Sequence, residues 1–198
     1  MRTFVLAASL AAPLLASAAD LVTNGSFEAD AQANGSWAIY NSLTGWMGPG
    51  IELRDNVAGT AFDGSNFVEL DSNKNSSMSQ TLTGIAGQYV LSFWYSARPN
   101  TAPGTNGLSF SLDGSTLGSV LVGVGNSSST HSWQQYSTLV DFDGSAALTF
   151  SAIELGDSYG GSLDKVSFTA AVPEPQTYAL MLAGLGAMGL IMSRRNRT

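Results

Sequence analysis

The amino-acid sequence predicts an all-β protein whose middle part forms a two-sheet antiparallel β-sandwich of the jelly-roll type. Short runs rich in aromatic and β-branched residues alternate with polar residues, and Gly, Asn, Asp or Ser separates the runs. Asp-Gly pairs at 113–114 and 143–144 stand between such runs, which is a strong signal for a hairpin. No long helical period interrupts residues 20–171.

Alternation within the runs predicts which side chains face the core. In residues 89–95 the odd positions, Tyr89 to Tyr95, fall on one face, and Val90, Ser92 and Trp94 fall on the other. Residues 67–70, 108–112, 148–150 and 166–168 alternate in the same way. The core is expected to include Val68, Leu70, Leu91, Phe93, Leu108, Phe110, Leu112, Leu148, Phe150, Val166 and Phe168.

Composition excludes several classes of function. The sequence has no cysteine and one histidine, which excludes disulfides, a thiolate nucleophile and a multi-histidine metal site. All fifteen acidic residues but only four of the basic ones lie between Asp20 and Glu174, which gives this part a net charge of −11. We therefore expect no nucleic-acid partner, because such binding needs basic side chains against the phosphates.

Residues 1–19 have the pattern of a secretory signal peptide. Arg2 supplies a basic start, residues 4–15 form a short apolar run, and Ala16-Ser17-Ala18 offers small residues for cleavage. The run is too short for a good membrane span, and an uncleaved anchor is the alternative. This predicts export through the inner membrane and a β-sandwich domain over residues 20–170.

Residues 171–198 contain three components in order. Pro173-Glu174-Pro175 comes first, the uncharged apolar stretch 176–192 follows, and Arg194, Arg195 and Arg197 come last. As a helix the apolar stretch would be about 25 Å long, close to the thickness of a bilayer core. The arginines would stay in the cytoplasm, so everything before them would face outward. A plain single-pass anchor is one interpretation of this transmembrane helix.

The order of Pro-Glu-Pro, apolar span and arginine cluster resembles the PEP-CTERM sorting signal. The resemblance implies that an exosortase, a membrane transpeptidase-like enzyme, recognises the motif and removes the tail. It also implies a Gram-negative bacterium that makes exopolysaccharide, with the processed protein on the cell surface or in the extracellular matrix. A eukaryotic GPI signal is the rival, but its hydrophobic tail runs to the terminus without an arginine cluster.

A second resemblance covers the β-rich domain. Residues 21–28, LVTNGSFE, with Gly45-Trp46 soon after, resemble the opening of galactose-binding-like jelly rolls, which include family 4/9/22-type carbohydrate-binding modules and DUF642 proteins. Residues 161–166, GSLDKV, resemble the closing Leu-Asp-Asn-Val strand of DUF642 proteins, with Lys165 in place of Asn. The resemblance implies the fold, whereas the ligand does not follow from the fold.

Related jelly rolls often hold a structural Ca²⁺ where the first and last strands meet, and the resemblance places Glu28 and Asp164 at such a site. Two carboxylates with backbone carbonyls suit this ion, although capping or solvated roles are an equal alternative. Asp71-Ser72-Asn73-Lys74-Asn75 matches the first half of an EF-hand loop. The match fails at Ser76 and Leu82, where Gly and Glu are required, so a polar loop is expected.

Aromatic side chains are the usual platform for sugars, because a ring packs on the apolar face of the sugar while polar neighbours bond its hydroxyls. Trp94 is the best candidate, since its strand neighbours direct the core to the opposite face, and Arg98 has the same parity. Packing beneath a loop is the alternative for each ring. The weaker candidates, in or near loops, are Trp37, Tyr40, Trp46, Trp133 and Tyr136.

Three functions are compatible with these observations. The first is a non-catalytic surface or matrix protein that binds exopolysaccharide in a biofilm, and the second is a structural matrix protein without a specific ligand. The third, a glycan or ester hydrolase, has little support because the sequence points to no base or carboxylate pair.

Overall fold

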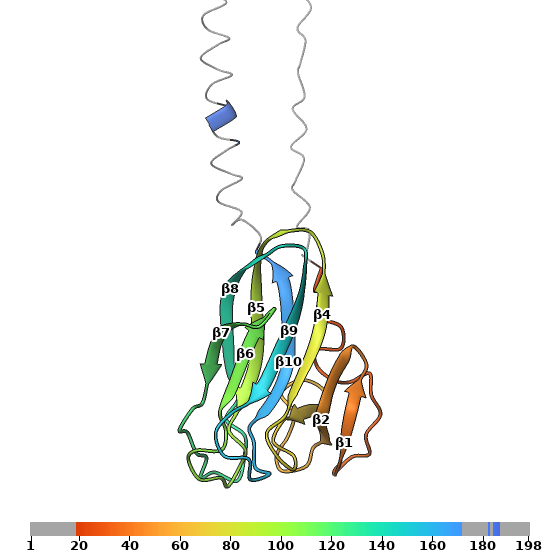
Figure 1. Cartoon of the computed structure of the whole chain (residues 1–198), viewed down its shortest axis with the longest axis vertical. Helices are drawn as coiled ribbons and strands as arrows, with labels where there is room; N and C mark the ends of the chain where they lie inside the picture. Colours follow the sequence, from red (N-terminus) through yellow and green to blue (C-terminus); the bar gives the residue numbers. More distant parts are fainter. Residues whose placement is uncertain (1–18, 172–181, 183, 187–198) are drawn as a thin grey trace, which may run out of the picture.

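Ten β-strands make up the domain in the computed structural model, which describes residues 19–171, 182 and 184–186 (Figure 1). The expected signal peptide and the expected transmembrane helix lie outside the described residues. Within the described part, no helix is long and apolar enough to cross a membrane. The strands are β1 Ser36–Leu43, β2 Trp46–Asp55, β3 Asn66–Glu69, β4 Ser77–Thr83, β5 Gly87–Ser96, β6 Leu108–Leu112, β7 Ser115–Val120, β8 Gln134–Phe142, β9 Ser145–Ala152 and β10 Ser162–Ala170.

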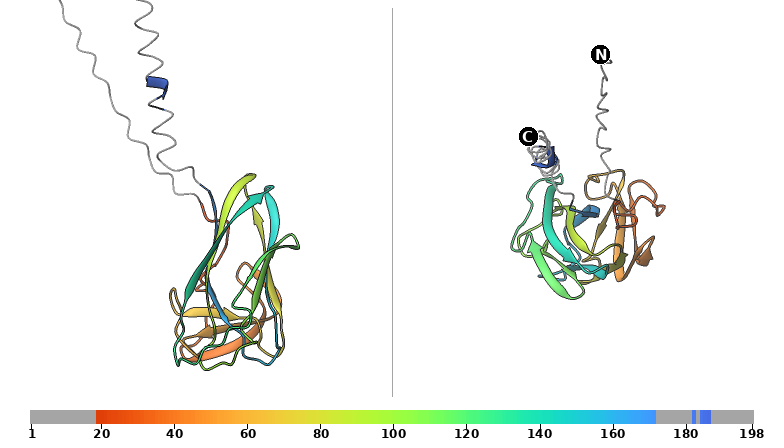
Figure 2. Two further views of the ribbon diagram at one scale, coloured as in Figure 1. Left: turned by 90° about the vertical axis from the view of Figure 1, so that its left-hand side faces the viewer. Right: turned by 90° about the horizontal axis from the view of Figure 1, so that it is seen from above.

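The strands form two antiparallel layers that are joined through β2. Hydrogen-bonded neighbours follow the order β7-β6-β9-β4-β2-β3-β10-β5-β8, and β1 pairs with β2. Met47 of β2 pairs with Ser79 of β4, whereas the end of the same strand, from Glu52 to Asp55, pairs with β3. Because β2 passes from one layer to the other, the sandwich is nearly a closed barrel, which is visible in the view from above (Figure 2). The expected β-sandwich is confirmed.

The two Asp-Gly pairs have different outcomes. Asp113 and Gly114 both have positive φ, 46° and 77°, and join β6 to β7 in a tight hairpin in which Leu112 pairs with Ser115. The hairpin expected at Asp143-Gly144 is wrong: β8 pairs with β5, and β9 pairs with β4 and β6. Here the turn carries the chain from one layer to the other, which the local sequence does not distinguish from a hairpin.

The core lies between the two layers and consists mostly of aromatic rings and leucines. All eleven core residues expected from the alternation are buried. Phe93 packs edge-on against Phe110 and Phe150, and Trp46 lies 6.0 Å from Phe27 and 6.1 Å from Phe150 between ring centroids. The face of β5 with Tyr89 to Tyr95 points into this core, as its parity predicted.

A long loop, residues 56–65, covers part of the outer face of the β3-β10-β5 layer. Asp164 of β10 accepts hydrogen bonds from the backbone N–H groups of Phe62 and Asp63, at 2.8 and 2.9 Å. The Phe62 ring stacks on Trp94 of β5 with 3.7 Å between centroids. The Thr60 carbonyl accepts the indole N–H of Trp133 at 3.1 Å. The loop therefore buries side chains that the alternation assigns to solvent.

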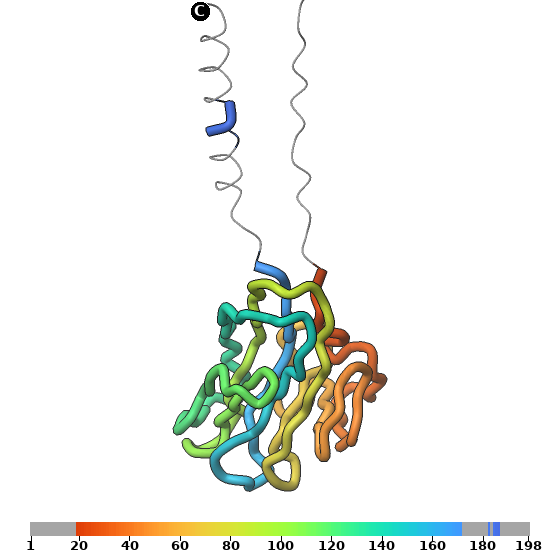
Figure 3. Tube along the Cα trace, turned by 45° about the horizontal axis from the view of Figure 1, so that its top comes forward, coloured from red at the N-terminus to blue at the C-terminus, as the bar shows by residue number. Residues whose placement is uncertain are grey.

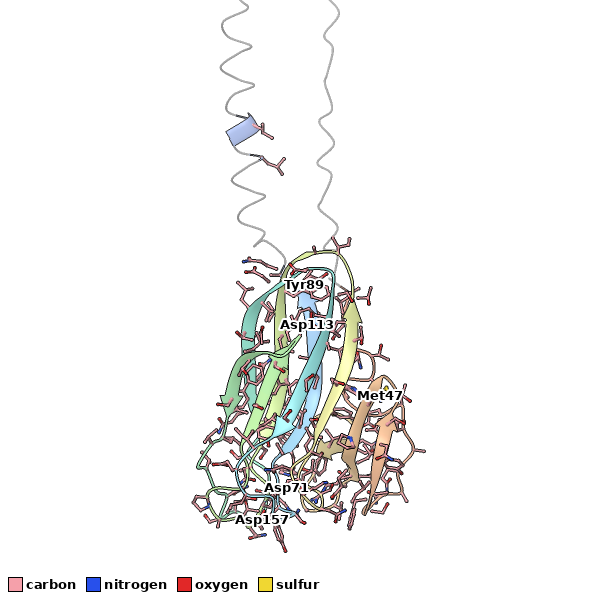
Figure 4. The ribbon with its side chains drawn as sticks, viewed as in Figure 1. Met47, Asp71, Tyr89, Asp113 and Asp157 are labelled. Carbon is pink, nitrogen blue, oxygen red and sulfur yellow. The ribbon has the colours of Figure 1, made fainter. Side chains whose placement is uncertain are left out.

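The two ends of the domain lie together at one pole. Asp20 bridges to Thr169, and the backbone N–H of Leu21 donates to the carbonyl of Phe168. Figure 3 shows the first and last described parts of the domain side by side. The loops that contain Asp71 and Asp157 lie at the opposite pole (Figure 4). The domain therefore has an attachment pole and a free loop pole.

Candidate functional site

A pocket of about 280 Å³ opens beside the loop pole, next to the β1–β2 hairpin. Its loop residues Ser72, Asn73 and Ser158 adjoin Asp71 and Asp157, which mark that pole in Figure 4. The lining combines an indole, two guanidinium groups, a carboxylate and small side chains: Trp37, Glu52, Arg54, Val57, Ala58, Ser72, Asn73, Arg98 and Ser158. We call it the Trp37 pocket.

Strand register explains why these side chains meet. Trp37 of β1 pairs with Arg54 of β2, and Glu52 of β2 pairs with Glu69 of β3. Cross-strand partners point to the same side of a sheet. The pairing therefore lines up an indole, a guanidinium and two carboxylates on the outer face.

The buried charges at the base of the pocket are paired with one another. Arg54 bonds Glu52 at 2.6 Å and Glu69 at 2.9 Å, and all three side chains are almost fully buried. Arg98 bonds Glu69 at 3.3 Å, and the N–H of Gly160 donates to the same carboxylate at 3.0 Å. Burial raises the pKa of Glu69 to about 8, although Arg54 and Arg98 act in the opposite direction. The network fixes the base of the pocket.

Above this base, the pocket offers one exposed aromatic ring with polar groups around it. The Trp37 side chain is 53 % exposed, whereas most of the large aromatic residues lie in the core. Asn73 is exposed beside it and provides an amide, and Arg98 remains partly exposed. A ring with polar groups around it suits a ligand that has an apolar face and hydroxyls at its edge, as a sugar does.

A second pocket, of about 250 Å³, lies on the other side of the 154–160 loop. Tyr159, which is 52 % exposed, is its aromatic residue. The Arg98 guanidinium lies 4.7 Å from the centroid of the Tyr159 ring. We call this the Tyr159 pocket, and its lining is Asn100, Thr101, Ala102, Pro103, Thr105, Leu155, Asp157 and Tyr159.

Of the ligand candidates selected from the sequence, the structure places Trp37 and Arg98 in the Trp37 pocket. Trp94 is stacked against Phe62, and Trp133 lies in the same aromatic cluster, 6.3 Å from Phe62. Trp46 is 1 % exposed and is therefore a core residue, which agrees with the packing alternative. Tyr136 stacks on Phe93 at the side of the core, 5.6 Å between centroids.

Several pocket residues have no signal in the alternation. In the sequence, Trp37 is only one of several aromatic residues near loops. The pattern around Glu52, Arg54 and Glu69 does not distinguish them from charged residues on the surface. Tyr159 lies in a loop without a recognisable motif. Only the pairing of β1, β2 and β3 brings the first four together.

Glu28 and Asp164, the expected calcium ligands, both hold the 56–65 loop or its end. Glu28 Oε1 accepts the N–H groups of Ser65 and Asn66 at 2.9 and 2.6 Å, and Asp164 Oδ2 accepts those of Phe62 and Asp63. In this arrangement Glu28 Oε1 and Asp164 Oδ2 serve as acceptors for the N–H groups of the loop. Among the described residues, no three or more His, Asp or Glu side chains gather as a metal site. Calcium stays a prediction from the resemblance.

His131 and Ser162 form a contact like that between the base and the nucleophile of a serine hydrolase. The ring atom Nε2 lies 2.9 Å from the Ser162 hydroxyl, and Nδ1 lies 2.9 Å from the Thr60 carbonyl, which can only accept. Burial lowers the pKa of His131, and its neutral ring therefore accepts a hydrogen bond from the Ser162 hydroxyl, as a general base would before proton transfer. However, Ser162 is completely buried, so a substrate carbonyl cannot reach its oxygen. The pair anchors the loop to β10.

The tail is the part of the chain that comparison with known families matches. The PEP-CTERM protein-sorting motif matches residues 171–196, which include Pro173-Glu174-Pro175 and two of the three arginines, Arg194 and Arg195. The chain carries a PEP-CTERM sorting signal. The PEP-CTERM signal marks the protein as exported, processed by an exosortase and sorted to the surface. No curated protein sequence matches the chain.

Solved structures resemble the domain in fold. A family 35 carbohydrate-binding module from Clostridium thermocellum has a TM-score of 0.47 at 15% identity, with 69% of this chain and 99% of that chain covered. TmCBM61, solved with β-1,4-galactotriose, has a TM-score of 0.46 at 20% identity and 77% and 99% coverage. The K2 adhesin domain of Lys-gingipain has a TM-score of 0.47 at 14% identity and 74% and 97% coverage. At these scores the similarity is one of architecture.

Proposed function

We propose that this PEP-CTERM protein is a non-catalytic binder of polysaccharide, and that the Trp37 pocket is its binding site. The exposed Trp37 ring above a buried and mutually paired Arg54–Glu52–Glu69 network carries the proposal. A fixed base leaves little side-chain entropy to be lost when a ligand binds. The natural ligand in this account is the exopolysaccharide of the bacterium that exports the protein.

The position of the pocket supports this role. Residue 171, where the sorting signal begins, lies at the attachment pole beside the start of the domain. The Trp37 pocket lies next to the loop pole. A protein held through its C-terminal end would therefore present the pocket away from the attachment point, where a polysaccharide can reach it.

Replacing Trp37 with alanine tests the proposal. The loss of an exposed anchor ring should weaken binding by about 2 kcal/mol, roughly thirtyfold in Kd. The measurement is retention of the exported protein, purified from the producing strain, on that strain's immobilised exopolysaccharide. Leu139→Ala is the matched control, because Leu139 is 57 % exposed on β8 and lines neither pocket.

The outcomes separate the three functions. Retention of the wild type and of Leu139→Ala, with loss of Trp37→Ala, supports the proposed site. A wild-type protein that is not retained contradicts polysaccharide binding and leaves a structural matrix role. A decrease in polysaccharide chain length during the experiment would instead indicate a hydrolase.

A further inference from the structure

We infer that the Tyr159 pocket continues the Trp37 pocket, so that the protein binds a run of sugars spanning both instead of a single sugar. This inference rests on the proposed function and specifies its ligand as an oligosaccharide segment. One sugar would pack on Trp37, and a later sugar of the same chain would pack on Tyr159.

Arg98 and the Ser158–Tyr159 segment form a wall between the two pockets. Ser158 lines the first pocket and Tyr159 lines the second. Arg98 lines the first pocket, donates to the Ser158 carbonyl at 2.9 Å, and lies over the Tyr159 ring. A chain that leaves the Trp37 pocket across Arg98 therefore meets the Tyr159 pocket next.

The 154–160 loop that forms this wall is held at several points. Glu154 accepts the N–H groups of Gly107 and Gly123 at 2.8 and 2.6 Å. Asp157 accepts the Thr105 hydroxyl, and its own N–H donates to Asp71 at 3.0 Å. These bonds tie the loop to three other segments, so both pockets keep their relative position before a ligand arrives.

The chemistry and size of the pockets fit consecutive sugars. Each pocket has one half-exposed ring, Trp37 at 53 % and Tyr159 at 52 %, with hydroxyl or amide groups around it. Each volume, about 280 and 250 Å³, lies below the range of about 300–1,000 Å³ that is typical of sites for drug-sized ligands. A ligand that contacts both rings must be longer than one sugar, because the Ser158–Tyr159 segment separates the two pockets.

The test is the dependence of affinity on chain length. The producing strain's exopolysaccharide is partially hydrolysed, separated by size into fractions from single sugars to long fragments, and titrated into the purified exported protein. The wild type should bind longer fragments about tenfold more tightly than the shortest fraction that binds. Tyr159→Ala should lose most of this gain while keeping its affinity for the shortest fraction.

Two further variants guard against an indirect effect through Arg98. Tyr159→Phe keeps the ring and should behave as the wild type. Leu155→Ser changes an exposed residue of the Tyr159 pocket that does not line the Trp37 pocket, and it should reduce only the gain with length. Thermal unfolding of each variant checks that the domain is intact.

The results distinguish the inference from the proposed function. If no fraction binds, the proposed function fails. If fragments bind in a manner that requires Trp37, but affinity does not increase with length and neither Tyr159→Ala nor Leu155→Ser changes it, the proposed site stands and the extended site is refuted.

Discussion

Replacing Arg54 with methionine should lower the free energy of unfolding by about 3–5 kcal/mol. Arg54 lies between Glu52 and Glu69, with 2.6 and 2.9 Å to their carboxylate oxygens, and all three side chains are 4 % exposed or less. Methionine fills similar space but leaves the buried Glu52 and Glu69 carboxyl groups without the guanidinium that bonds both of them. Because buried groups cannot be rehydrated without opening the structure, most of this cost should appear in stability. Denaturation by urea measures it.

Lys165 provides the matched control for Arg54. Its ammonium group lies 3.6 Å from Asp63, but both side chains are about half exposed. An exposed ion pair contributes less than about 1 kcal/mol, so Lys165→Met should leave stability nearly unchanged. A loss for Arg54→Met as small as that for Lys165→Met would show that the network does not fix the base of the Trp37 pocket.

Stability should decrease by a few kcal/mol, in order of magnitude, as the pH rises from about 5 to about 9. Burial raises the pKa of Glu69 from 4.5 to about 8 and the pKa of Asp164 from 3.8 to about 7. A carboxyl group whose pKa is higher in the folded protein holds its proton more tightly there than in the unfolded chain. Its stabilisation is complete below the unfolded pKa, near 4, and is lost as the pH rises through about 7 and 8.

Asp164→Asn isolates one of the two groups. The amide does not ionise, and its oxygen can still accept the N–H groups of Phe62 and Asp63, so the decrease with pH should become shallower. Thermal and urea unfolding between pH 5 and pH 9, in the presence of a chelator, give the comparison. Asp143→Asn, an exposed position, should keep the wild-type slope. An unchanged slope in Asp164→Asn would mean that Asp164 does not titrate in this range.

The sequence predicts the strands well where one face meets the core and the other meets water. The alternation in β5, β6 and β9 identifies core residues such as Leu91, Phe110 and Phe150, because a period of two distinguishes the faces directly. The turn at Asp113-Gly114 is also predictable from the sequence. The two residues between the strands must both have positive φ, and an Asp-Gly pair adopts this conformation readily.

The alternation does not identify the candidate site, because part of the outer face of the sheet is covered by other segments of the chain. Glu69 and Phe67 alternate with Val68 in β3, which assigns them to water, yet both are completely buried. His131 and Trp133 pack edge-on against Phe67, and Arg54 and Arg98 enclose Glu69. Burial of this face depends on contacts between segments far apart in the chain, which a local pattern does not contain.

The β1–β2 hairpin shows the same limit at the level of whole strands. Gly48, Pro49 and Gly50 lie inside β2 and weaken any strand pattern there. Gly48 is needed because a side chain at this position would meet the Ser77 carbonyl of β4. The break in the pattern thus marks the point where β2 passes between layers and brings Trp37 to its pocket.

Hydrogen–deuterium exchange of the exported protein, with and without its strain's exopolysaccharide, tests the central claim most directly, because it locates the contact without a mutation. If the polysaccharide binds at the Trp37 pocket, exchange should slow around residues 36–38, 57–58, 71–73 and 158. Exchange should stay unchanged at the attachment pole around Gln88, whose carbonyl accepts the N–H of Ala171. No protection anywhere, or protection confined to the attachment pole, would contradict polysaccharide binding at the Trp37 pocket.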